Sequence, residues 1–193
     1  MNLHETLSGP EAEDPQQAIE RLKELADELK DEFPKLLVVI GAYQGPDSLN
    51  ETLRRIPDGV IPLIEEIAVF GLFSEDCSTE SCEDLKKNPA WEKLKYYRIP
   101  RPYEYGENLK NGFDYAIEKG FDYVVVLRGD ATYDPAYVPL LFLSALLTRS
   151  PVVIGDRMGA AAQGRSEASG SGVRRWANRM LSRVEEFILR MGL

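Results

Sequence analysis

Histidine and cysteine are scarce in this sequence. Its 193 residues include one histidine, His4, and two cysteines, Cys77 and Cys82. Structural and catalytic zinc sites are built mainly from these two residue types, so a zinc site here would need acidic ligands and is disfavoured. In a cytosolic protein we expect the two cysteines as free thiols, with a disulfide between them as the alternative.

Long apolar runs and an excess of basic charge are also missing. No run of about 18 apolar residues occurs, so the sequence encodes no membrane-spanning helix. The opening stretch MNLHETLSGPEAEDP lacks the basic and apolar regions of a signal peptide, which makes a cytosolic location the expectation. The net charge of −9 argues against a nucleic-acid partner, because the phosphate backbone selects basic surfaces.

The composition is that of a globular domain, with 44% hydrophobic and 28% charged residues. The charge is unevenly spread along the chain. Residues 1–32 hold ten acidic and three basic side chains, a net of −7, whereas residues 165–193 hold six arginines and three glutamates, a net of +3. We therefore expect the two ends to have different partners.

The N-terminal part is predicted as a flexible acidic lead, residues 1–13, followed by an amphipathic helix over residues 14–34. Asp14 is placed to cap this helix, with Pro15 at its first position and Gln17 three residues after the cap. The apolar residues that follow at helical spacing are Ala18, Ile19, Leu22, Leu25, Ala26 and Leu29.

Short apolar runs alternate with helical patterns through residues 35–158. Strands are predicted over residues 36–40, 67–70, 96–99, 123–127 and 151–154, and helices around residues 49–56, over residues 107–119 before Gly120, and from Pro135 onward. This alternation predicts an α/β fold with a mostly parallel sheet. The polar loops at residues 41–48, 74–81 and 128–134 follow the strands and should converge on one cleft.

Two further segments complete the predicted organisation. Residues 159–172 are rich in Gly, Ala and Ser and are interpreted as a mobile loop. Residues 173–193 have apolar residues at helical spacing beside several arginines, which predicts an amphipathic helix. That pattern suits a membrane-interface helix and a core-packing helix equally well.

The strand at residues 123–127 leads into Arg128-Gly129-Asp130. A carboxylate such as Asp130, held in a cleft loop, can coordinate a hard divalent cation. On spacing alone, an aspartate after a strand is more often a turn or cap residue.

The ordered set of motifs resembles the family 2 glycosyltransferases, in particular the branch of dolichol-phosphate mannose synthase and polyprenol-phosphate glycosyltransferases. The stretches that carry the resemblance are VVIGAYQGPDSLNETLRRIP, SEDCSTES, GENLKNGFDYAIEKGFDYVVVLRGDATYDP, VVIGDRMG and RRWANRMLSRVEEFILRMGL. It implies a GT-A-type nucleotide-diphospho-sugar transferase fold. The implied activity is transfer of a hexose from a nucleoside diphosphate sugar to a polyprenyl (dolichyl) phosphate, peripherally at the cytosolic membrane face.

The resemblance also implies roles for matching positions. Nucleotide-binding positions are Ala42, Tyr43, Glu75 and Asp76. Asp130 would hold Mg²⁺ or Mn²⁺ on the diphosphate, and Arg157 would face phosphate groups. The loop at residues 159–172 would admit the acceptor, and the arginine-rich helix at residues 173–193 would meet an anionic membrane or the lipid phosphate.

Several positions depart from the family pattern, and the departure at Arg128 is the most serious. Arg128 stands where the family has the first aspartate of its DxD motif, Gly41 replaces a proline, Gly45 replaces a glutamate, and Glu75 replaces an aspartate. An arginine there weakens metal binding, because like charges repel. Three outcomes stay open: metal-dependent catalysis, catalysis with Arg128 taking over part of the metal's role, or a catalytically degenerate nucleotide-sugar-binding or scaffold module.

Overall fold

The computed structural model describes residues 14–42, 46–71, 92–98 and 105–155. Clustering of contacts divides the chain into two compact units, Met1–Val153 and Ile154–Leu193. Nearly all described residues belong to the first unit. The predicted mobile loop and C-terminal helix, and both cysteines, lie outside the described residues.

Four parallel strands form the sheet of the described part: β1 (Leu36–Ala42), β2 (Ile64–Gly71), β3 (Leu94–Arg98) and β4 (Tyr123–Arg128), in the order β3-β2-β1-β4. The first four strand predictions are confirmed, within a few residues at each end. The fifth, at residues 151–154, is wrong. Residues 151–155 have no strand hydrogen bonding, and Val152 is 69% exposed, as expected of a segment that no neighbouring strand covers.

The predicted helices are confirmed as α2 (Pro15–Leu29), α3 (Pro46–Arg54), α5 (Tyr105–Lys119) and α6 (Val138–Thr148). Short 3₁₀ turns at Lys30–Glu32, Ile61–Leu63 and Pro135–Tyr137 extend or connect them. The start of α2 follows the predicted signals, because the Asp14 carboxylate accepts the backbone N–H groups of Gln16 and Gln17, each at 2.9 Å. After α5, Gly120 adopts φ +71°, the left-handed conformation that glycine takes at no steric cost.

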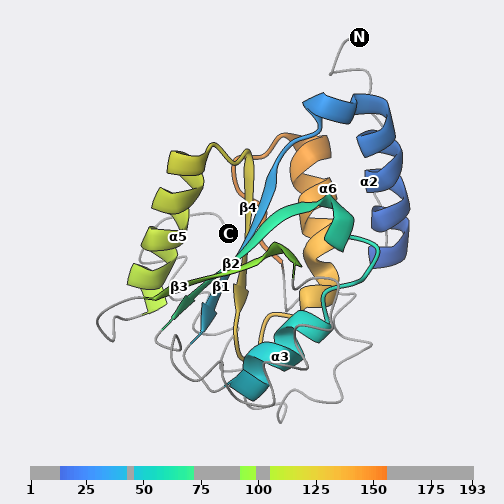
Figure 1. Cartoon of the computed structure of the whole chain (residues 1–193). Helices are drawn as coiled ribbons and strands as arrows, with labels where there is room; N and C mark the ends of the chain where they lie inside the picture. Colours follow the sequence, from blue (N-terminus) through green and yellow to red (C-terminus); the bar gives the residue numbers. More distant parts are fainter. Residues whose placement is uncertain (1–13, 43–45, 72–91, 99–104, 156–193) are drawn as a thin grey trace, which may run out of the picture. The chain divides into compact units, whose positions relative to one another are not determined.

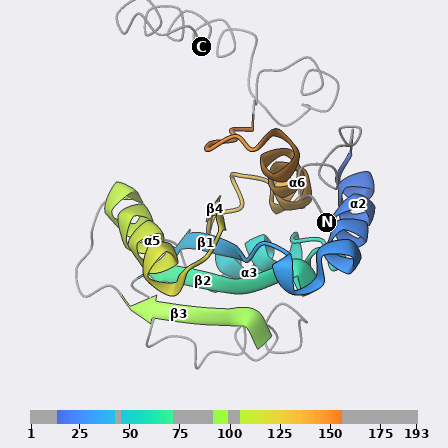
Figure 2. The same cartoon turned by 90° about the horizontal axis from the view of Figure 1, so that it is seen from above.

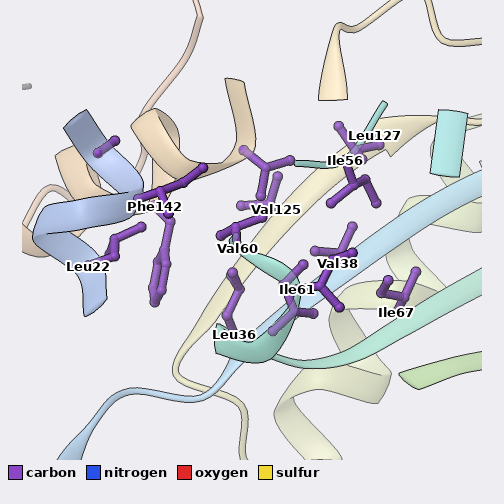
Figure 3. Close-up of a cluster of buried hydrophobic side chains, with 14 of the residues drawn as sticks. Leu22, Leu36, Val38, Ile56, Val60, Ile61, Ile67, Val125, Leu127 and Phe142 are labelled. Atoms are coloured by element: carbon purple, nitrogen blue, oxygen red, sulfur yellow. The ribbon is translucent and has the colours of Figure 1, made fainter. Parts of the chain in front are cut away.

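Helices cover both faces of the sheet (Figure 2). Successive residues of β1 point to opposite faces. The side chains of Leu36, Val38 and Ile40 join the larger core with residues of α2, α3 and α6. Figure 3 shows part of this core, in which Leu22 and Phe142 from the helices lie beside Leu36 and Val125 from the strands.

Helix α5 covers the other face, where Leu37 and Val39 of β1 meet Ala68, Phe70 and Ala116. Its approach to β1 depends on Gly112. A Cβ atom at that position would lie 2.6 Å from Val39 Cγ1, well inside the normal contact distance.

A buried carboxylate lies within this second layer. Glu66 of β2 is 6% exposed and accepts hydrogen bonds from the hydroxyls of Tyr115 (2.7 Å) and Tyr97 (3.2 Å). Lys95 of β3 forms an ion pair with its other oxygen. Burial and the bonds to Tyr97 and Glu66 raise the pKa of the Tyr115 hydroxyl well above its usual range. The cluster links β2, β3 and α5, and it compensates the desolvation of the carboxylate.

Candidate active site at the carboxyl ends of β1 and β4

The strand order reverses next to β1. From β1 the chain adds β2 and then β3 on one side, whereas β4 returns to the opposite side of β1. In open α/β sheets, ligands bind outside the carboxyl ends of the two strands at such a switch point. The carboxyl ends in question are Gly41 of β1 and Arg128 of β4, which are partners in the strand register. Beyond them, the Gly129 N–H donates to the Gly41 carbonyl at 2.9 Å.

A tight turn over residues 128–131 shapes this edge of the sheet. The Ala131 N–H donates to the Arg128 carbonyl at 3.2 Å, and Ala131 adopts φ +53°. A residue other than glycine in the left-handed region carries a steric cost of about 1–2 kcal/mol. Backbone of this kind persists where the surroundings hold it in place, and it is common at functional sites.

The surroundings that hold the turn come from α3. Thr52 is completely buried, and its hydroxyl accepts the Ala131 N–H at 3.0 Å. The same hydroxyl donates to the Ser48 carbonyl at 3.0 Å. The Arg128 carbonyl lies 3.4 Å from it and is a second, longer acceptor. Helix α3 lies at the end of the sheet to which the arrowheads of β1 and β4 point (Figure 1). Thr52 therefore ties the helix that follows β1 to the turn that follows β4.

Within the turn, Arg128 and Asp130 form a two-point ion pair. Arg128 Nη2 lies 2.8 Å from Asp130 Oδ2, and Arg128 Nε lies 3.2 Å from each carboxylate oxygen. The Thr132 N–H also donates to Asp130 Oδ1 at 3.0 Å. Burial alone would raise the pKa of Asp130, but the bonds from Arg128 and Thr132 outweigh it and lower that pKa to about 2. Asp130 is therefore ionised at neutral pH.

Two further contacts hold the segment after the turn. Asp134 caps the short turn that begins at Pro135, accepting the Ala136 N–H at 3.1 Å, and it forms a 3.0 Å ion pair with Arg55. Arg55 directly follows α3. The segment from Ala131 to Asp134 is therefore held at both ends by the region of α3, at Ala131 by Thr52 and at Asp134 by Arg55. The Tyr133 ring lies 6.0 Å from the Arg128 guanidinium carbon, close enough for a cation–π contact.

In the part of the chain that the structure describes, the donor set around Asp130 does not fit a divalent cation. Among the residues that the structure describes, no three His, Cys, Asp or Glu side chains come together. Both oxygens of Asp130 already accept from Arg128. The positively charged guanidinium would also repel a divalent cation bound at Asp130.

Two of the residues selected from the sequence, Arg128 and Asp130, are brought together at the switch point. Ala42 is the last residue of β1 and lies at the same edge of the sheet. The other selected residues, Tyr43, Glu75, Asp76 and Arg157, lie outside the described residues.

Sequence reasoning missed Thr52. The signal was present, because Thr52 lies three residues after Leu49 and four before Ile56, on the apolar face of the helix. A polar residue in the middle of such a face needs a buried partner, and here that partner is the Asp130–Ala131 turn.

No protein of curated function matches this chain. Among solved structures, it is similar to that of the mannosyltransferase PcManGT from Pyrobaculum calidifontis in complex with GDP-Man and Mn²⁺. The identity is 17% and the TM-score 0.47, over 72% of this chain and 41% of the other, so the chain spans less than half the length of that structure. In the described part of the chain, no helix is both long and apolar enough to cross a membrane.

The family model for glycosyl transferase family 2 matches residues 37–189, which is most of the chain. Its match covers all four described strands apart from Leu36, the first residue of β1, and it includes the turn that carries Arg128 and Asp130. The expected fold class, a GT-A-type α/β fold with a parallel central sheet flanked by helices, is confirmed. The chain belongs to glycosyl transferase family 2.

Proposed function

We propose that this chain is a glycosyltransferase that moves a hexose from a nucleoside diphosphate sugar to a polyprenyl phosphate. The observation that carries the proposal is the charged Arg128–Asp130 turn at the switch point of a family 2 chain. A crevice at this position is where α/β sheets bind nucleotides. A guanidinium held in it suits the oxygens of a diphosphate.

The proposed reaction is a displacement at the anomeric carbon of the sugar. An oxygen of the acceptor phosphate forms the new bond to that carbon, while the bond to the diphosphate breaks and the nucleoside diphosphate leaves with the electron pair. The acceptor oxygen is already deprotonated at neutral pH, so the protein needs no nucleophile of its own. Its contribution is to orient the two substrates and to stabilise the developing charge on the leaving group.

Individual roles follow from the family resemblance and the position in the sheet. Ala42, Tyr43, Glu75 and Asp76 are proposed to line the pocket for the nucleoside. The position of Ala42 supports this assignment. Ala42 is the last residue of β1, and the residue before it, Gly41, is the register partner of Arg128 at the end of β4. Arg157 is proposed as a second contact to phosphate oxygens. Because the described donor set does not fit a divalent cation, we derive no step through Mg²⁺ or Mn²⁺.

The acceptor is proposed from the character of the C-terminal sequence. Residues 165–193 carry a net charge of +3, and residues 173–193 have apolar side chains at helical spacing. A basic amphipathic segment of this kind attracts anionic lipid surfaces and phosphate head groups. This supports a polyprenyl phosphate acceptor and a peripheral position at the cytosolic membrane face.

A second candidate function is a catalytically degenerate relative that binds nucleotide sugars or serves as a scaffold. The observation that favours it is the arginine at position 128, where the family has a carboxylate. A degenerate module would keep nucleotide binding without transfer.

The test combines a binding assay with a transfer assay. Nucleoside diphosphates and their sugars are screened for stabilisation of the purified chain against heat, and bound ligands should raise the midpoint. A radiolabelled donor of the preferred base is then incubated with the chain and vesicles containing a polyprenyl phosphate. Label in the lipid fraction supports the proposed function, and binding without transfer supports the degenerate module. A chain that none of these nucleotides stabilises excludes both the transferase and the nucleotide-sugar-binding module.

A further inference from the structure

We infer that the Arg128 guanidinium supplies the positive charge at the donor diphosphate, and that this chain therefore binds its nucleotide without a divalent cation. This inference rests on the proposed function and assigns the chemistry of its central step. It starts from the disagreement between the metal that family 2 implies and the side chains present around Asp130.

The first support is the orientation of the guanidinium. The Asp130 carboxylate contacts Nε and Nη2, and so it holds one edge of the planar group in a defined position. The Tyr133 ring contacts Arg128 as well. An arginine held in this way loses less conformational freedom when it binds a phosphate, because its side chain is already ordered.

The second support is accessibility. The Arg128 side chain is 40% exposed, whereas that of Asp130 is 19% exposed, so the cation is the more accessible member of the pair. Arg128 ends β4 at the switch point, where a nucleotide would place its phosphates. The Asp130 carboxylate accepts a hydrogen bond from the Thr132 backbone N–H, which holds it in place. Asp130 thereby acts as a positioning residue for Arg128.

The third support is that Arg128 takes the position a metal ion would need. A cation bound to Asp130 would have to displace the guanidinium from both carboxylate oxygens. The pair as it stands is electrically neutral, whereas two carboxylates would offer two negative charges to a metal. A guanidinium also presents several N–H donors in one plane, which matches the oxygens of a diphosphate.

The experiment measures the thermal midpoint of the chain with the preferred nucleoside diphosphate, in excess EDTA and in Mn²⁺. We expect the wild-type chain to be stabilised equally in both. Arg128→Gln should bind roughly 10- to 100-fold more weakly in both, the range expected for losing a hydrogen bond to a charged group. Arg128→Asp restores the two-carboxylate pattern, so it should lose binding in EDTA and regain it in Mn²⁺.

The control is Arg149→Asp, which makes the same change of charge as Arg128→Asp. Arg149 directly follows the last residue of α6, at the end of that helix that is far from the switch point (Figure 1). It should bind as the wild type does in both conditions. Stabilisation of the wild-type chain that requires Mn²⁺ overturns this inference and leaves the proposed function standing, and this comparison needs no variant to fold. Unchanged binding by Arg128→Gln also overturns it. If no nucleoside diphosphate stabilises the wild-type chain in either condition, the proposed function fails, and this inference fails with it.

Discussion

The Thr52 hydroxyl should be worth more to stability than its size suggests. In Thr52→Val the shape of the side chain is kept, while the hydroxyl that accepts the Ala131 N–H at 3.0 Å is removed. The Ser48 carbonyl also loses a donor, but as a residue of α3 it stays near other helical donors. The Ala131 N–H keeps only its longer bond, the one to the Arg128 carbonyl at 3.2 Å.

The expected cost follows from the burial of this contact. Thr52 is completely buried, so water cannot easily replace its hydroxyl. Losing one of the two hydrogen bonds of a partly buried donor costs about 0.5–1.5 kcal/mol. In a domain of 150–250 residues, each 1 kcal/mol lowers the melting temperature by roughly 2–4 °C. We therefore expect Thr52→Val to melt about 1–6 °C below the wild type.

A matched control is available in Thr148→Val. The Thr148 hydroxyl also donates to a carbonyl four residues earlier, that of Ser144, at 2.7 Å, and it accepts the Ser150 N–H at 3.3 Å. These bonds are exposed, so water can replace them, and the change should stay within about 0.5 kcal/mol. Urea unfolding of both variants gives the two free energies of unfolding. Equal losses in the two variants would refute the reasoning, because burial would then make no difference.

Three further predictions concern other parts of the described structure. Gly112→Ala should lower the free energy of unfolding by about 1–3 kcal/mol, because its Cβ would lie 2.6 Å from Val39 Cγ1; calorimetry checks this, and an unchanged midpoint would contradict the close approach of α5 to β1. Glu66→Leu removes the acceptor of Tyr115 and Lys95 and one of the two acceptors of Tyr97, so it should destabilise more than Glu66→Gln, which keeps one acceptor oxygen. Equal losses in urea unfolding would show that these bonds contribute little. Because the pKa of Asp130 lies at about 2 instead of the usual 3.8, its stabilising contribution should be complete above about pH 4 and disappear as pH falls toward 2. Asp130→Asn should flatten this part of the profile of unfolding free energy against pH, and an unaltered slope would mean that the pairing with Arg128 does not stabilise the fold.

Several features of the fold could be predicted from sequence because their causes are local. The apolar runs at residues 36–40 and 123–127 are both strands, the first fully buried and the second buried at Val125 and Leu127. Asp14 caps α2 as its spacing indicates. Gly120 takes the left-handed conformation expected after a helix. The run at residues 151–154 has the same apolar character, yet it forms no strand. A strand exists only where a neighbour supplies hydrogen bonds, and that is a tertiary condition.

The sequence selects Arg128 and Asp130 as candidate site residues, but it does not indicate how their side chains are arranged. Both residues follow the strand at residues 123–127, but nothing along the chain indicates which side chain Arg128 contacts. In the structure Arg128 pairs with Asp130, while Asp134 pairs with Arg55. Both members of the Arg128–Asp130 pair lie in the turn that the Ala131 N–H closes by donating to the Arg128 carbonyl.

Sequence alone determined the α/β class, the helices and strands of residues 14–148 and the altered DxD-like motif, because periodicity, capping and motif spacing depend on neighbours along the chain. Tertiary structure decided the strand order, the register that sets Gly41 beside Arg128, and the contact between Thr52 and Ala131, which are 79 residues apart. It also decided that the arginine is held beside Asp130 by a two-point ion pair. Such partnerships depend on which surfaces pack together, and packing is a property of the whole fold.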